Sequence, residues 1–135
     1  MPSLIAIALT GPDLVNALLD VWDRGDAALP LDPAAPAPAR EALLQAMAPA
    51  SIVDADGSHP LADARPVEEV DALVVATSGS TGIPKGVVHT HSSLVASARM
   101  ISDALDVDTA TDRWLCCLPL THIAGLAIVV RAIVS

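Results

Sequence analysis

The residues best suited to chemistry form one polar turn, which runs from Thr77 to Gly86 and reads Thr-Ser-Gly-Ser-Thr-Gly-Ile-Pro-Lys-Gly. Glycines let backbone amides face a ligand that side chains would obstruct, and hydroxyl groups add further donors. The ammonium group of Lys85 is a point charge suited to phosphate oxygens. These groups together predict that the turn binds a polyphosphate chain, through Thr77, Ser78, Gly79, Ser80, Thr81, Gly82 and Lys85.

Two other interpretations of the turn are weaker. A P-loop requires glycine immediately before its lysine and Ser or Thr immediately after it, whereas Pro84 precedes Lys85 here and Gly86 follows it. A mobile surface linker would explain the Gly and Ser content. Such a linker needs neither the lysine nor the proline, and it needs no apolar run such as Ala72 to Ala76 directly before it. Polyphosphate binding therefore remains the favoured interpretation.

Two segments resemble motifs of the acyl-adenylate-forming superfamily, which includes acyl-CoA synthetases, luciferases and peptide-synthetase adenylation domains. The first is TSGSTGIPKGVVHTH, beginning at Thr77, and the second is LPLTHIAGL, from Leu118 to Leu126. The resemblance implies that the turn wraps the β- and γ-phosphates of ATP, with Lys85 acting in catalysis. It also implies that His122 is catalytic and lies near the acyl-substrate pocket. Thr121 stands where many members carry an aromatic residue.

A narrower resemblance is to bacterial o-succinylbenzoate–CoA ligases of menaquinone biosynthesis. It rests on the short region before the turn and on the stretches DRWLCCLPL and HIAGLAIVVRA. This resemblance implies ATP, Mg²⁺ and coenzyme A as cofactors or co-substrates, and a small carboxylic acid as the substrate. The carboxylate would attack the α-phosphorus of MgATP and release pyrophosphate, and the CoA thiol would then displace AMP. An adenylation domain that serves a carrier protein is the alternative within the same superfamily.

The resemblance also carries an expectation about domains. Residues 1–135 would be an incomplete N-terminal part of an AMP-binding domain, with residues 54–70 as a surface linker and the C-terminal domain absent. Members of the superfamily use a downstream glutamate for Mg²⁺, an aspartate for the ribose and a lysine on a mobile C-terminal domain, and none of these can be located in this sequence. Such a portion is expected to be inactive alone. A truncated, non-enzymatic remnant that binds nucleotide stays open as an alternative.

Other potentially reactive side chains favour structural roles. His89 and His91 alternate, as two residues on one face of a strand would, but zinc needs three or four ligands and no further cluster is visible, so no metal site is expected. The adjacent cysteines Cys116 and Cys117 lie in an apolar run and are expected to be reduced and buried. An acidic stretch lacks the glycine and glutamate of a calcium loop and is expected to be solvated; it contains Asp103, Asp106, Asp108 and Asp112.

Composition excludes several classes of partner. The formal net charge is −9 and the seven Lys and Arg residues are scattered, so neither nucleic acid nor an anionic membrane surface is an expected partner. The apolar stretch Leu115 to Val134 includes Pro119, His122 and Arg131, which favours a buried strand–loop–helix over a membrane span. No basic region marks a signal peptide at the N-terminus. Together with the thiols, these features predict a cytoplasmic protein without membrane insertion.

The elements that must position the turn alternate between strands and helices. Short apolar runs predict strands at 3–9, 28–31, 51–53, 72–76, 87–90 and 114–118. Helical spacing predicts helices after Gly11, over 40–47, after Ser92 or Ser93 as N-cap, and over 123–134, the last with a strand as its alternative. This alternation predicts an α/β fold with a mixed, mostly parallel sheet and flanking helices, as in the N-terminal subdomain of an adenylate-forming enzyme.

Overall fold

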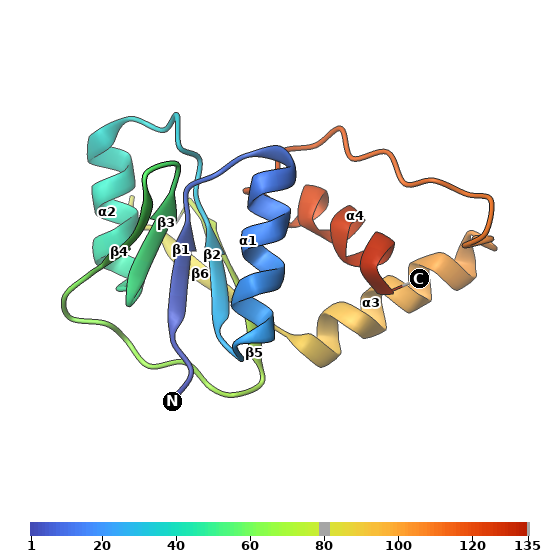
Figure 1. Ribbon diagram of the computed structural model, residues 1–135, viewed down its shortest axis with the longest axis horizontal. Helices are drawn as coiled ribbons and strands as arrows, with labels where there is room; N and C mark the ends of the chain where they lie inside the picture. The colour runs from blue at the N-terminus through green and yellow to red at the C-terminus, as the bar shows by residue number, and fades with distance from the viewer. Residues whose placement is uncertain (79–81, 135) are drawn as a thin grey trace.

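A computed structural model describes residues 1–78 and 82–134 (Figure 1). The described elements are, in chain order, β1 (Leu4–Ile7), α1 (Gly11–Asp23), β2 (Ala27–Pro30), α2 (Ala37–Met47), β3 (Ser51–Asp54), β4 (Gly57–Pro60), β5 (Asp71–Thr77), β6 (Lys85–Thr90), α3 (His91–Ala104) and α4 (Ile123–Val134). The strands described in these ranges form one sheet in the order β4-β3-β1-β2-β5-β6.

The centre of the sheet is parallel and both of its edges are antiparallel. β1 pairs in parallel with β2 and β3, and β2 pairs in parallel with β5. β4 and β6 are added at the edges as antiparallel hairpins on β3 and β5. Every residue of β1 and β2 is buried, as expected for parallel strands covered on both faces. The expected α/β fold with a mixed, mostly parallel sheet and flanking helices is therefore confirmed.

Helices cover the two faces of the sheet separately. Side chains alternate between the faces along β1, so that Ile5 and Ile7 pack with α1, α3 and α4, whereas Leu4 and Ala6 pack with α2. Figure 1 shows α2 on the opposite side of the sheet from α1. The larger core cluster joins Leu14 and Leu18 of α1 to Leu126 of α4 through Leu73 of β5; its other buried members are Val21, Ala28, Ala72, Val75, Leu94, Ala98 and Val130.

Trp22 connects three elements of this core. Its indole Nε1 donates a hydrogen bond of 2.7 Å to the carbonyl oxygen of Ala72 in β5. The edge of its ring system meets His91 at the start of α3, with ring centroids 5.4 Å apart. His91 is the first residue of α3, so it does not share a strand with His89. β6 ends at Thr90, one residue earlier.

Three local features of the secondary structure differ from the sequence-based expectation. The side chain of Thr90, rather than of Ser92 or Ser93, caps α3, since Thr90 Oγ1 accepts a hydrogen bond of 3.2 Å from the Ser93 amide. α2 begins at Ala37, because prolines are tolerated in a first helical turn. The expected linker at 54–70 contains β4. The chain reverses direction after Asp54, so that Gly57, the first residue of β4, pairs with Asp54 of β3. The sequence did not predict this strand, because β4 is exposed and has the polar composition of a loop.

The expected strand at 114–118 is also wrong, and so is the burial of the cysteines it contains. Residues 112–117 have no regular secondary structure, and Cys116 and Cys117 are both exposed free thiols. Instead of pairing with the sheet, this segment is attached to α4. The Arg131 guanidinium lies 4.8 Å from the centre of the Trp114 ring. An apolar run alone does not distinguish a strand from a segment packed on a helix.

Gly86 allows α2 to approach β6 closely. A β-carbon placed on Gly86 would lie 2.7 Å from Met47 Sδ and 2.8 Å from Val74 Cγ1. The glycine was expected to open the turn toward a ligand, but it lies within β6 and pairs with Ala76. In the structure, Gly86 therefore permits close packing of β6 against Met47 of α2 and Val74 of β5.

We expect Gly86→Ala to lower the free energy of unfolding by about 1–3 kcal/mol, because the added methyl group overpacks this contact. Urea unfolding of the wild type and the variant measures the difference. In a Met47→Ala background the same substitution should cost less, since the sulfur atom that it meets is gone. An equal cost in both backgrounds would contradict the packing described.

Candidate functional site

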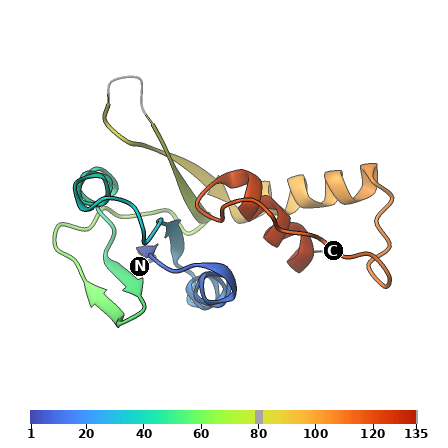
Figure 2. The same cartoon turned by 90° about the horizontal axis from the view of Figure 1, so that it is seen from above.

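The polar turn joins two antiparallel strands, β5 and β6, at the end where Thr77 pairs with Lys85. The Thr77 hydroxyl donates a hydrogen bond of 3.2 Å to the Lys85 carbonyl oxygen, which ties the last residue of β5 to the first residue of β6. Figure 2 shows this hairpin standing out from the rest of the molecule. Because β5 is buried along most of its length, it gives the turn a rigid support.

Four of the expected phosphate-binding residues are described, and all of them are exposed: Thr77, Ser78, Gly82 and Lys85. Gly82 has φ of +79°, a conformation that favours glycine, and no atom lies within 4 Å of a β-carbon placed on it. Lys85 is the only lysine in the sequence. Gly79, Ser80 and Thr81 lie outside the described residues. The described part of the turn is thus open to solvent and not covered by packed side chains.

The second motif segment forms a tight bend followed by α4. The His122 carbonyl oxygen accepts hydrogen bonds of 3.1 Å from the amides of Gly125 and Leu126, so its main chain starts the helix. The His122 side chain is exposed. Leu126, one turn along, is fully buried in the core. The apolar anchor therefore fixes the bend, while the imidazole of His122 remains accessible.

Gly125 is a further important residue of this segment that the sequence interpretation did not single out. A β-carbon placed on it would collide with the Pro119 carbonyl oxygen and would lie 2.8 Å from that of Leu118. Only a glycine lets the bend press directly against the first turn of α4. A glycine inside an otherwise apolar helical pattern was the available signal, since such a glycine usually has a packing reason.

The structure brings parts of the two motif segments together but does not join their reactive groups. His89 of β6 and Ile123 of α4 line one small cavity of about 120 Å³, together with residues of α3. Within residues 1–78 and 82–134, no recorded hydrogen bond or ion pair connects Lys85 with His122. α3 and α4 are thus the elements that hold the two segments relative to each other.

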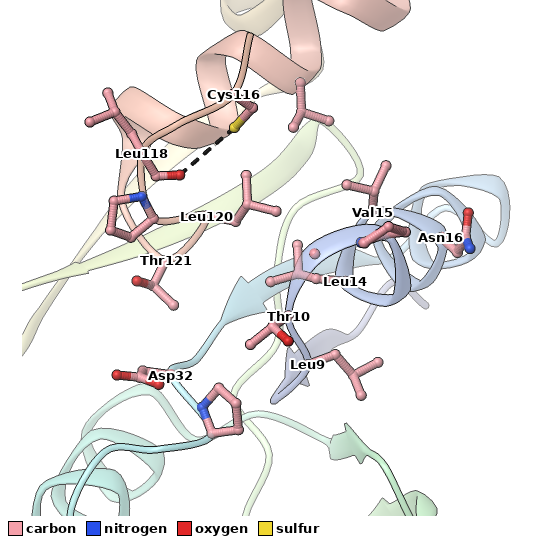
Figure 3. Close-up of a pocket in the computed structure, with 15 residues that line it drawn as sticks. Leu9, Thr10, Leu14, Val15, Asn16, Asp32, Cys116, Leu118, Leu120 and Thr121 are labelled. Atoms are coloured by element: carbon pink, nitrogen blue, oxygen red, sulfur yellow. Dashed lines mark hydrogen bonds between the residues drawn. The ribbon is translucent and has the colours of Figure 1, made fainter.

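A larger cavity of about 710 Å³ opens next to the second motif segment (Figure 3). Cys116 and the residues Leu118 to Thr121 form one of its walls, but His122 does not line it. None of the described phosphate-turn residues lines it either. This cavity is therefore a separate feature from the turn at the end of the hairpin.

Residues 54–135, which contain both motif segments, match the family described as AMP-binding enzyme. The chain belongs to this family. It is 54% identical over 55 residues to malonate–CoA ligase of Arabidopsis thaliana and 49% identical over 63 residues to 2-succinylbenzoate–CoA ligase of Enterococcus faecalis. These matches cover 41% and 47% of this chain.

The fold agrees with the same family. Escherichia coli MenE with bound OSB-AMS superposes with a TM-score of 0.76 at 26% identity, over 96% of this chain and 32% of that one. The chain spans only 9% and 13% of the two curated relatives named above. The AMP-binding family and its N-terminal α/β fold, both expected from the two motifs, are confirmed.

Two negative findings concern the described residues alone. In residues 1–78 and 82–134, no group of three or more His, Cys, Asp or Glu side chains could hold a metal ion. Over the same residues, no helix has the length and apolar character needed to cross a membrane.

We expect Gly125→Ala to lower the free energy of unfolding by about 1–3 kcal/mol or more, since the obstructing atoms belong to the backbone. Ala124→Ser is the matched control, because Ala124 is exposed one residue earlier in α4 and should change stability by no more than about 0.5 kcal/mol. Thermal and urea unfolding both measure the effect. Equal stability of the two variants would show that the bend does not need its glycine.

Proposed function

We propose that this chain is the nucleotide-binding N-terminal part of an ATP-dependent carboxylic acid–CoA ligase. The observation that carries the proposal is the exposed turn at the end of the β5–β6 hairpin, with its single lysine and uncrowded Gly82, in a chain of the AMP-binding family. Hydroxyl groups, accessible amides and one ammonium group are the partners that phosphate oxygens prefer.

In the proposed reaction, a carboxylate attacks the α-phosphorus of ATP, forming an acyl-adenylate and releasing pyrophosphate. CoA sulfur then attacks the acyl carbon, and AMP leaves. The residues proposed to hold the β- and γ-phosphates are Thr77, Ser78, Gly79, Ser80, Thr81, Gly82 and Lys85. Lys85 would offset the negative charge that grows on the departing pyrophosphate, an electrostatic effect that is often the largest single contribution to catalysis. His122 is proposed to lie beside the activated carboxylate.

The proposed acid is o-succinylbenzoate, in menaquinone biosynthesis, and the proposed acceptor is coenzyme A. Relatives named as ligases for 2-succinylbenzoate and for malonate support a CoA acceptor, and both of those acids carry two carboxyl groups. Mg²⁺ is proposed to arrive bound to ATP, since the described residues offer no group of metal ligands. The free thiols of Cys116 and Cys117 are consistent with a reducing cytoplasm as the proposed compartment.

We expect Lys85→Ala to weaken the binding of ATP and of tripolyphosphate to this chain by about tenfold, because a charge-assisted hydrogen bond contributes about 1.5–3 kcal/mol. Isothermal titration calorimetry measures both affinities. Arg99→Ala is the matched control, as it removes one exposed positive charge from α3 and should leave both affinities unchanged. Equal weakening by the two substitutions would show that Lys85 acts only through the net charge of the protein, which would contradict the proposed site.

The ligase activity itself is tested in the protein encoded by the complete reading frame. We expect pyrophosphate release with 2-succinylbenzoate and transfer of the acyl group to CoA, and Lys85→Ala should lower ATP–pyrophosphate exchange more than it weakens binding of the acid. Malonate and benzoate serve as comparison acids. Transfer only to a phosphopantetheinyl carrier protein would assign the alternative acceptor. A stop codon directly after Ser135, with nucleotide binding but no exchange, would support the non-enzymatic remnant.

A further inference from the structure

The cavity of about 710 Å³ lies at the carboxyl ends of β1 and β2. Leu9 and Thr10 follow β1, and Asp32 and Pro33 follow β2 after one intervening residue. The opposite wall is formed by Cys116 and Leu118 to Thr121 (Figure 3). Its volume falls within the range of about 300–1,000 Å³ typical of small-molecule sites.

The topology of the sheet favours a ligand site at this place. β1 lies between β2 and β3, and all three strands are parallel. The chain leaves β1 toward β2 and then returns to the other side of β1 as β3. In open α/β sheets, ligands bind outside the carboxyl ends of the strands where such a reversal occurs. The cavity lies beside this reversal.

Most of the cavity wall is apolar. Leu14 and Val15 of α1 lie across the opening from Leu120 (Figure 3), and Val129 of α4 also contributes to the wall. Leu14 is almost completely buried and Leu120 is packed against the core, so these parts of the wall are supported from behind. A compact apolar group, of the size of one aromatic ring, would remove the partly exposed surfaces of Val15 and Leu120 from water.

The polar groups of the cavity favour a positively charged ligand. The Asp32 side chain lines the cavity and accepts one hydrogen bond of 2.9 Å from the Ala34 amide through Oδ1. Thr10 and Thr121 also line it, and the Thr10 hydroxyl does not cap α1. No Lys or Arg is among the lining residues. A carboxylate and two hydroxyl groups that line the same cavity, without a Lys or Arg among its described lining residues, are complementary to an amine.

We propose that this cavity binds a small primary amine whose apolar body, about one aromatic ring in size, rests between Val15 and Leu120 while its ammonium group faces Asp32. This site is separate from the phosphate turn and does not depend on the proposed ligase activity. The reactivity of the two cysteine thiols can show whether the cavity is occupied. Cys116 lines the cavity and Cys117 does not, although both thiols are exposed.

The first test uses 2-phenylethylamine as the probe, with 2-phenylethanol and phenylacetate as neutral and anionic analogues of similar shape. N-ethylmaleimide alkylation is followed in two single-thiol variants, Cys117→Ser and Cys116→Ser. We expect saturating amine to slow alkylation of Cys116 by at least about fivefold and to leave Cys117 unchanged, with the neutral analogue weaker and the anion without effect. Unchanged alkylation of Cys116, or equal protection of both thiols, overturns the proposal.

The second test concerns the charge of Asp32. Asp32→Asn keeps the oxygen that accepts from the Ala34 amide, so the turn is preserved while the charge is lost. It should weaken binding of 2-phenylethylamine by about threefold to fivefold, as measured by amide chemical shifts, and should abolish the preference over 2-phenylethanol. Asp13→Asn is the matched control, since Asp13 lies in the first turn of α1 and does not line the cavity. A preference that survives Asp32→Asn, or that Asp13→Asn removes equally, overturns the assignment. ATP binding at the hairpin should be unaffected in either variant.

Discussion

The antiparallel pairing of β6 with β5 is the constraint on which the candidate site depends. β5 is held inside the sheet by its parallel partner β2 and by helices on both faces, with four successive buried residues. Its last residue, Thr77, pairs with Lys85, the first residue of β6. A short polar segment is thereby attached to a buried strand that is paired on both sides. A flexible linker of the same composition would lose more conformational entropy when it became ordered around a ligand.

Two close contacts at glycines set the positions of the two family motifs. Gly86 brings β6 against Met47 of α2 on one face of the sheet, and Gly125 brings α4 against the bend at Leu118 and Pro119 on the other. Neither glycine has a positive φ angle, so conformational freedom does not explain them. The space that a methyl group would occupy is filled by a neighbour in both places. These glycines of the motifs thus serve packing, whereas Gly82 serves the backbone conformation of the turn.

The sequence predicted the parts of the fold that follow from local periodicity. Apolar runs located β1, β2 and β5, and helical spacing located α1 and α4, because burial on both faces or on one stripe leaves a clear pattern. The run from Trp114 to Leu118 has the same composition as a strand, yet Trp114 packs with Arg131 of α4 and the cysteines remain exposed. β4 is an exposed edge strand with the composition of a loop. In both segments the local structure depends on tertiary contacts, which cannot be predicted from composition.

The candidate site was predictable where it is continuous in sequence and not where distant segments meet. The turn from Thr77 to Lys85 could be identified from hydroxyl groups, glycines and one lysine in order. The large cavity could not, since its walls come from residues 9–16, from Asp32 and Pro33, and from residues 116–121 together with Val129. Only the pairing of β1 with β2 and the packing of α4 bring these segments together.

Protection of Lys85 from acetylation tests the central claim most directly, because Lys85 is the only lysine and the Met1 amine serves as an internal reference. Mass spectrometry would follow acetic anhydride labelling of both amines with increasing tripolyphosphate. The structure predicts that saturating tripolyphosphate slows labelling of Lys85 and leaves Met1 unchanged. Labelling of Lys85 at an unaltered rate, or equal slowing at both amines, would contradict a phosphate site at the end of the β5–β6 hairpin.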